Sequence, residues 1–428
     1  PAEVEAVQEF VESNVISKLT KDALSTLDEL SLSPIPLDEN EIYDSNGIGE
    51  LDESAILRWF EQKSEPHHLI RNVRRSLWSE EERKKMHQKA ANYWSEIDSE
   101  KALWIETYHK INSNNFETSL LIDKISTISQ ENSATAALLI EDAIKFEDDD
   151  NLRIKAVDIA FERAEYEIID NHLSMIEDSP QKNLRMAKLF RINGDIDSAI
   201  KLEDTCLPLL SPAEQIRFRI SMLVRRFDDR IPRKIDNYIA EEILTEIHSL
   251  DFQEISDTDR FTAELTLNLL KHSIALEISD MTLASQSRSE LEIILSDNEE
   301  HLLMLDLRAR LAISSSSELS DLTLDSVHSF IQDCSDQLKK ISMIHSALEV
   351  TKPNFPDWLI ESHDSLFQNP LREDLAAYRR MSAHCWYWRG VIHPNYRLSY
   401  WQEAIHRFRA AECNQAANEL LEELTKSI

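Results

Sequence analysis

The sequence predicts an all-α protein built mainly from stacked helical hairpins of the tetratricopeptide type. Apolar residues recur at spacings of three and four, as at Phe261, Leu265 and Leu269, which gives each helix one apolar stripe. Alternating strand patterns are nearly absent. Only 4 of the 428 residues are glycine, so few positions favour the positive φ that tight hairpins and phosphate-binding loops require. Neither a Walker A loop nor a complete dinucleotide-binding glycine motif is present.

Two segments follow along the chain. We expect residues 1–98 to form a small winged-helix-like helical module and residues 99–428 to form a tetratricopeptide-like α-solenoid, with a sub-break near 350–356. Helix starts carry the expected signals. A capping serine at Ser79 precedes three glutamates, and Ser211 is followed by a proline and then by Glu214 at the third helical position.

A faint repeat supports the solenoid. The segment 193–200 has the turn and second-helix start of a tetratricopeptide unit around Gly194, with small residues at Ala187, Ala199 and Cys206. Such positions are small because the two helices of a hairpin cross there. Diverged copies are predicted at 114–120, where an asparagine takes the left-handed turn position, and at 401–411.

The first hundred residues carry a more specific signal. An apolar helix at 55–60 is followed by His67-His68-Leu69-Ile70-Arg71, then by Leu77-Trp78-Ser79-Glu80-Glu81-Glu82-Arg83, and then by His87-Gln88-Lys89-Ala90-Ala91-Asn92-Tyr93. This order resembles the junction in signal-transducing multidomain ATPases of the STAND class, where a winged-helix module leads into tetratricopeptide-like repeats. The resemblance covers about residues 15–120 and, more loosely, the helical remainder.

The resemblance implies a role but not a catalytic one. In such proteins the nucleotide-binding module lies upstream of the winged helix, and this sequence starts where that module would have ended. The resemblance further implies that His68 contacts nucleotide, provided that an upstream ATPase module exists. The alternative is that His68, Leu69 and Arg71 only pack and cap the end of the winged helix.

Charge and composition narrow the function classes. The formal net charge is −33, and such a surface repels phosphate backbones and anionic lipids, so we expect neither nucleic acid nor a membrane as the principal partner. We expect a cytoplasmic protein, because no apolar run reaches the length of a membrane span, the start lacks a secretory signal, and the four cysteines lack metal-site spacing. Residues 384–413 contain two cysteines and three histidines without the spacing of a zinc finger. Adjacent acids such as Asp228 and Asp229 are interpreted as solvated turns. We predict no enzyme activity, no catalytic residue, no metal and no cofactor.

One segment stands out as a candidate partner site. Residues 378–409 interleave aromatic residues with arginines, the combination that dominates interface hot spots. The predicted partner-binding residues are Arg379, Arg380, Trp386, Trp388, Arg389, Arg397, Tyr400, Trp401 and Arg407. The alternative is that the aromatic residues form a hairpin core. Trp386 and Trp388 cannot both face the same side of a helix, so at least one should lie on a surface or against a neighbouring hairpin.

The predicted function is therefore a non-catalytic sensor and protein-interaction arm of a signal-transducing ATPase, which binds a protein or peptide partner. One alternative is a stand-alone helical-repeat adaptor or scaffold. Another is a winged-helix transcription regulator that would bind DNA through basic residues of the first module, namely Arg71, Arg74, Arg75, Lys84 and Lys85.

Overall fold

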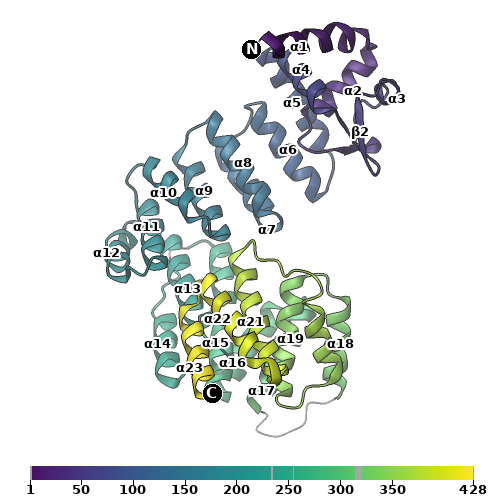
Figure 1. Ribbon diagram of the computed structural model, residues 1–428. Coiled ribbons are helices and arrows are strands. Elements are labelled where there is room, and N and C mark those ends of the chain that lie inside the picture. Colours follow the sequence, from purple (N-terminus) through teal and green to yellow (C-terminus); the bar gives the residue numbers. More distant parts are fainter. Residues whose placement is uncertain (1, 233–234, 254, 314–320, 428) are drawn as a thin grey trace. The chain divides into compact units, whose positions relative to one another are not determined.

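The computed structural model describes residues 2–232, 235–253, 255–313 and 321–427 and is helical along most of that length (Figure 1). The predicted all-α hairpin fold is confirmed. The chain divides into two compact units, Pro1–Glu177 and Asp178–Ile428. The predicted module boundary at residue 98 falls inside the first unit, between two helices, and stays a prediction.

The first unit begins with a small mixed module. Its elements are α1 (Ala2–Asn14), α2 (Lys21–Leu32), β1 (Leu37–Asp38), α3 (Ile48–Glu53), β2 (Leu57–Phe60), β3 (Lys63–Pro66), α4 (His68–Ser76) and α5 (Glu80–Trp94), with short 3-10 turns at Ile16–Lys18 and Glu39–Glu41. The core holds Leu27, Leu30, Leu51 and Ile56, all at most 1% exposed. These apolar residues from α2, α3 and the start of β2 bury one face of the module.

A small antiparallel sheet is the feature of this module that the sequence did not predict. Its strand order is β1-β3-β2, with Leu37 opposite Ser64 and Leu57 opposite Pro66. The winged-helix-like character of this module stays a prediction. The strands lack an alternating pattern because β2 exposes three consecutive residues.

Helical hairpins make up the rest of the first unit. They are built from α6 (Glu100–Asn112), α7 (Thr118–Glu131), α8 (Ser133–Phe146), α9 (Asp150–Arg163) and α10 (Tyr166–Met175). Each helix contacts the next along the chain. Short connections and alternating direction are typical of helical-repeat packing.

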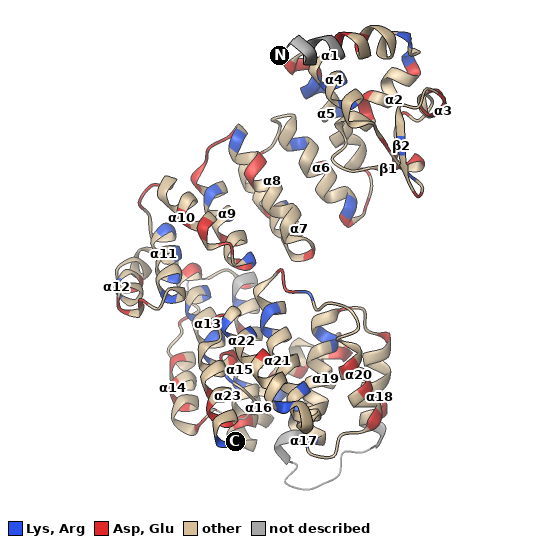
Figure 2. Cartoon of the chain, viewed as in Figure 1, with Lys and Arg blue, Asp and Glu red and all other residues tan. Residues whose placement is uncertain are grey.

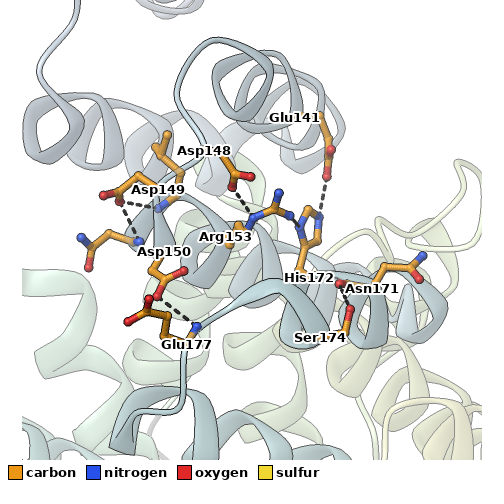
Figure 3. A network of polar contacts seen from close by, with 11 residues as sticks. Glu141, Asp148, Asp149, Asp150, Arg153, Asn171, His172, Ser174 and Glu177 are labelled. Atoms are coloured by element: carbon orange, nitrogen blue, oxygen red, sulfur yellow. Dashed lines mark hydrogen bonds and ion pairs between the residues drawn. The ribbon is translucent and has the colours of Figure 1, made fainter.

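A polar network ties α8, α9 and α10 together (Figure 3). Arg153 donates to Asp148 at 2.5 Å and contacts His172 Nδ1 at 3.4 Å, while His172 Nε2 lies 2.7 Å from Glu141 Oε1. In this arrangement Nδ1 accepts from the arginine and Nε2–H donates to the carboxylate. The hydrogen bond from His172 holds the pKa of Glu141 below its usual range. Asp149 caps α9 by accepting from two backbone N–H groups.

The second unit is a two-layered array of hairpins (Figure 1). Its helices are α11 (Pro180–Ile192), α12 (Ile196–Cys206), α13 (Pro212–Asp228), α14 (Asn237–His248), α15 (Asp257–Glu277), α16 (Met281–Ile294), α17 (Glu299–Ile313), α18 (Asp321–Asp333), α19 (Gln337–Thr351), α20 (Asp357–Ser365), α21 (Ala376–Ile392), α22 (Arg397–Ala410) and α23 (Asn414–Ser427). The first helices of successive hairpins, α13, α15, α17, α19 and α21, contact one another and form one layer. Their hairpin partners pack against them from the other side.

The repeat positions predicted from the sequence occupy the expected places. Gly194 has φ +84, and Ala187, Ala199 and Cys206 are buried where α11 and α12 cross. In the first unit Asn114 takes the left-handed position with φ 51 at the turn between α6 and α7. The third predicted copy is the hairpin of α22 and α23, where Trp401, Ala404 and Phe408 are buried.

The last helix of the second unit packs back against α13, so the array from α13 to α23 closes on itself (Figure 1). Arg225 pairs with Glu412 at 2.9 Å, and Arg230 pairs with Glu419 at 3.0 Å. Asp229 accepts hydrogen bonds from two backbone N–H groups at the start of α23, at 3.1 and 3.3 Å. A side chain about 187 residues away in the sequence therefore caps the closing helix.

Candidate functional site

The basic residues of the first module are largely used within the module itself. Arg74 forms two hydrogen bonds with Asp28 at 2.5 and 3.0 Å. Arg71 pairs with Glu65 at 2.6 Å, and Arg75 donates to a backbone carbonyl of α2. Burial lowers the pKa of Arg75. The basic segment of α4 in Figure 2 is thus mostly a structural element, whereas Lys85 on α5 is exposed.

His68 lies at the start of α4 with an exposed side chain. Its Nε2 is 3.1 Å from the side-chain amide nitrogen Nδ2 of Asn72, one helical turn further along the chain. Leu69 beside it is 49% exposed, so this part of the motif does not pack into the module. The position leaves His68 accessible, and its contact with a nucleotide stays a prediction.

Helix α21 presents two functional faces, separated by the helical periodicity. Arg380, His384 and Trp388 follow each other at four-residue spacing on the face toward the inner layer, where all three line a cavity. Trp386 and Arg389 lie on another face, toward α22. The expectation that Trp386 and Trp388 point in different directions is confirmed, because Trp388 is 2% exposed and Trp386 is half-buried.

On the second face the structure brings several predicted residues into one aromatic–arginine cluster, which consists of Phe367, Trp386, Arg389, Tyr400 and Arg407. The Arg389 guanidinium lies 4.1 Å from the ring centre of Phe367, 4.8 Å from that of Tyr400 and 5.3 Å from that of Trp386. All five side chains are half-buried, so they are ordered and still reach solvent. Cation–π contacts of this kind hold an arginine in place without neutralising its charge.

Other residues of the predicted set have structural partners. Trp388 and Trp401 belong to the core, at 2% and 6% exposure, and we therefore remove both from the partner-facing surface. Trp401 Nε1 donates to the carbonyl of Tyr387 at 3.0 Å, and a Cβ added at Gly390 would lie 2.3 Å from the Trp401 indole. The indole fills that space because position 390 has no side chain.

Three arginines of the set, Arg379, Arg397 and Arg407, are held in place by hydrogen bonds or ion pairs. Arg379 donates to the carbonyl of Glu373 at 3.3 Å, and Arg397 donates to the carbonyl of Gly390 at the same distance. Arg407 pairs with Glu373 and, at 2.6 Å, with Glu403. Its charge is thus largely compensated, and Arg389 is the less compensated cation of the cluster.

The second unit also contains a cavity of about 810 Å³. Five helices of the inner layer and the loop after α13 supply its wall. The charged and histidine side chains on that wall are Asp228, Arg230, Glu277, Arg308, His345, Glu349, Arg380 and His384. Hydroxyl groups of Ser273, Ser279, Ser342 and Ser346 lie among them. A cavity of this size and polarity suits a ligand of small-molecule dimensions.

Burial sets the protonation of the cavity histidines. Desolvation, together with the nearby positive charge of Arg380, lowers the pKa of His384 to about 4. The pKa of His345 is lowered well below its usual value, again mainly by burial. Both rings are therefore neutral near pH 7 and can each donate and accept a hydrogen bond.

Sequence reasoning missed the cavity and misread Asp228. The interpretation of Asp228 and Asp229 as solvated turns is wrong: Asp228 is half-buried on the cavity wall, where desolvation raises its pKa, and Asp229 caps α23. Four-residue spacing of Arg380, His384 and Trp388 was the one available signal. It shows a shared helix face but does not show that the face borders a cavity.

The cysteines do not form a reactive centre. Burial raises the pKa of the Cys385 thiol, and burial likewise raises that of Cys413 to about 12. Both thiols are protonated near neutral pH and poor nucleophiles. In the described part of the chain, no group of three or more histidine, cysteine or acidic side chains is arranged to hold a metal ion. None of the described helices combines the length and the apolar character that crossing a membrane requires.

Comparison with known proteins gives one likeness in fold. No family model matches the chain, and no curated protein matches it by sequence. Among solved structures, the chain is similar to a Signal Transduction ATPase with Numerous Domains (STAND) protein with a tetratricopeptide repeat sensor from Pyrococcus horikoshii. The identity is 14% and the TM-score 0.42, over 96% of this chain and 54% of that protein. The chain thus spans about half the length of the solved protein.

Proposed function

We propose that this chain is a non-catalytic regulatory arm that binds a protein or peptide partner, in the manner of the sensor of a signal-transducing ATPase. Helical-hairpin arrays present many side chains on continuous surfaces and bind partners through them. The order of motifs in residues 15–120 supports the assignment to a STAND-type arm. The accessible position of His68 suits a contact with an upstream ATPase module.

The observation that carries the proposal is the aromatic–arginine cluster on α21 and α22. It concentrates three aromatic rings around Arg389, whose charge no acidic side chain of the described structure offsets within 4.0 Å. Arg389 Nε is buried and has no hydrogen-bond partner among the described residues. The Arg389 side chain as a whole is half-buried and its charge is uncompensated, so we expect an acidic peptide or protein segment to bind here.

The test is affinity capture followed by a measured affinity. The full chain, a Trp386→Ala/Arg389→Gln variant and an Arg409→Gln control would be used to capture proteins from the source cells. Arg409 is an exposed arginine on α22 outside the cluster. We expect at least one captured protein to be retained by the control and lost by the double variant. Its affinity for the purified double variant should fall by about 10- to 100-fold, the usual effect of truncating a hot spot. Equal binding by the double variant would remove the cluster as the binding surface.

Two other functions are proposed as alternatives to the regulatory arm. A stand-alone adaptor would use the same cluster without an ATPase module, and a functional complementation test with separately expressed ATPase modules would distinguish the two. A winged-helix transcription regulator would need DNA affinity, and the internal pairing of Arg71 and Arg74 weighs against it. Retardation of duplex DNA by the full chain at low salt would favour the regulator.

A further inference from the structure

The cavity of the second unit lies on the opposite face of α21 from the aromatic–arginine cluster. Its wall comes from α13, α15, α17, α19 and α21, and it holds about 810 Å³. Known small-molecule pockets measure roughly 300–1,000 Å³. The lining is unusual for an inter-helix space, because charged groups, histidines and serines stand where apolar side chains would complete a core. This polar space is suited to a ligand.

Several charges on the cavity wall already have partners within the protein. Arg230 pairs with Glu419 at 3.0 Å. Glu277 and Glu349 each take part in polar interactions of their own. The described wall therefore carries three carboxylates, Asp228, Glu277 and Glu349, and three arginines, of which Arg308 and Arg380 form no ion pair within 4.0 Å with the described residues.

Arg308 and Arg380 are the arginines of the described wall that no carboxylate contacts directly. Arg308 is oriented by a hydrogen bond from its Nη1 to Ser273 Oγ at 2.8 Å. Arg380 makes neither a hydrogen bond nor an ion pair with the described residues, and both guanidinium groups act on Asp228 only across space. Desolvation raises the pKa of Asp228 against the opposing effect of Arg380 and Arg308. Half-buried arginines without counter-ions favour the entry of an anion.

From these two arginines without a contacting carboxylate we infer that the cavity is a binding site for a small organic ligand with an oxyanion group, carboxylate or phosphate, held between Arg308 and Arg380. Guanidinium groups bind such oxyanions through paired N–H donors. Asp228 and the neutral imidazoles of His345 and His384 supply hydrogen bonds to hydroxyl or amide groups on the rest of the ligand. The ligand site lies on the inner face of α21, and this inference does not depend on partner binding at the aromatic–arginine cluster.

Calorimetric titration of the full chain tests the inference. The probes are inorganic phosphate, succinate and succinamide, the uncharged counterpart of succinate. The proteins are the wild type, Arg380→Gln, Arg308→Gln and the exposed control Arg409→Gln. Far-UV circular dichroism and thermal unfolding of each variant confirm that it is folded, and Arg380→Lys serves as a charge-preserving variant if either glutamine variant unfolds.

We expect saturable binding of phosphate or succinate by the wild type and the control, and none of succinamide. Each glutamine variant should bind about 10- to 100-fold more weakly, which corresponds to the loss of a charge-assisted hydrogen bond. Arg380→Lys should bind with intermediate affinity, because it keeps the charge and loses the paired donors. Whichever anion binds identifies the phosphate or the carboxylate as the preferred group. Absence of saturation by either anion up to about 10 mM, where a Kd near 1 mM would be evident, would overturn the inference. Equal binding by the glutamine variants, or equal binding of succinamide, would overturn it as well.

Discussion

Two buried histidines in the first unit should make its repeat helices sensitive to acid. His87 on α5 and His109 on α6 are 4% and 2% exposed, and their Nδ1 atoms lie 2.8 Å apart. One ring must donate and the other accept, so the accepting ring is neutral in this geometry, and burial disfavours the charged form of both rings. Desolvation lowers the pKa of each to about 3; Arg75 contributes further for His87, and the neighbouring ring for His109.

The sign and size of the effect follow from proton linkage. In the unfolded chain each histidine takes up a proton as the pH falls through about 6.5, whereas in the folded protein it does so only near pH 3. Folding stability is therefore retained above pH 6.5 and falls steadily between pH 6.5 and 3. At pH 5 the loss is about 2 kcal/mol for each histidine, or about 4 kcal/mol for the pair, since one pH unit corresponds to about 1.4 kcal/mol.

Hydrogen exchange of the full chain, read by mass spectrometry on peptides from α5 and α6, measures this loss locally. The protection factors remove the intrinsic pH dependence of exchange. From pH 7 to pH 5 we expect them to fall by about three powers of ten. A His87→Asn/His109→Asn variant keeps a short side-chain hydrogen bond at the Nδ1 positions and cannot titrate, so its protection should change far less. His67→Asn replaces an exposed histidine and should behave like the wild type. An unchanged fall of protection in the double variant would refute the reasoning.

Three further substitutions probe packing and capping. Gly390→Ala should destabilise the protein by about 1–3 kcal/mol, seen as a lower midpoint of thermal unfolding, because the added Cβ would overlap the neighbouring indole. Gly49→Ala is the control: no atom lies within 4 Å of its added Cβ, so its unfolding midpoint should be nearly unchanged. Glu419→Gln should speed hydrogen exchange in α23 by about tenfold through loss of its pair with an arginine of the loop after α13, and the exposed Glu422→Gln should not. Asp149→Ala should destabilise α9 by about 1 kcal/mol through loss of the N-cap, seen as faster exchange confined to its first turn. The assigned contacts would be contradicted if Gly390→Ala and Gly49→Ala shifted the unfolding midpoint equally, or if Glu419→Gln and Glu422→Gln changed exchange in α23 equally. Unaltered exchange in α9 of Asp149→Ala would contradict the N-cap.

The parts of the fold that depend on local sequence were predictable. Small residues at Ala187 and Ala199 and a glycine at the turn specify a helix crossing within one hairpin, and all three lie where expected. The opposite orientation of Trp386 and Trp388 follows from the helical period alone. Local signals of this kind do not depend on how successive hairpins stack.

Neither the sheet of the first module nor the closure of the second unit was predictable in the same way. Strand β3 contains lysine, serine, glutamate and proline and has no strand-like composition; it is paired because β1 and β2 flank it. Asp229 finds its partners about 187 residues away, and that proximity depends on the rotation accumulated over all the intervening hairpins. Sequence periodicity specifies which face of each helix is apolar, but it does not specify the total rotation over many stacked hairpins.

The loop after α13 links the cavity to the closure of the second unit. Three consecutive residues at the end of α13 and the start of the loop make these contacts. Asp228 faces the cavity, Asp229 caps α23, and Arg230 lines the cavity and pairs with Glu419. A ligand that binds Arg308 and Arg380 would change the charge beside Asp228 and so act on the same loop. By linkage, any preference of the ligand for the closed arrangement stabilises the closure by the same free energy. A binding event inside the cavity would then act on the contacts that this loop makes with the start of α23.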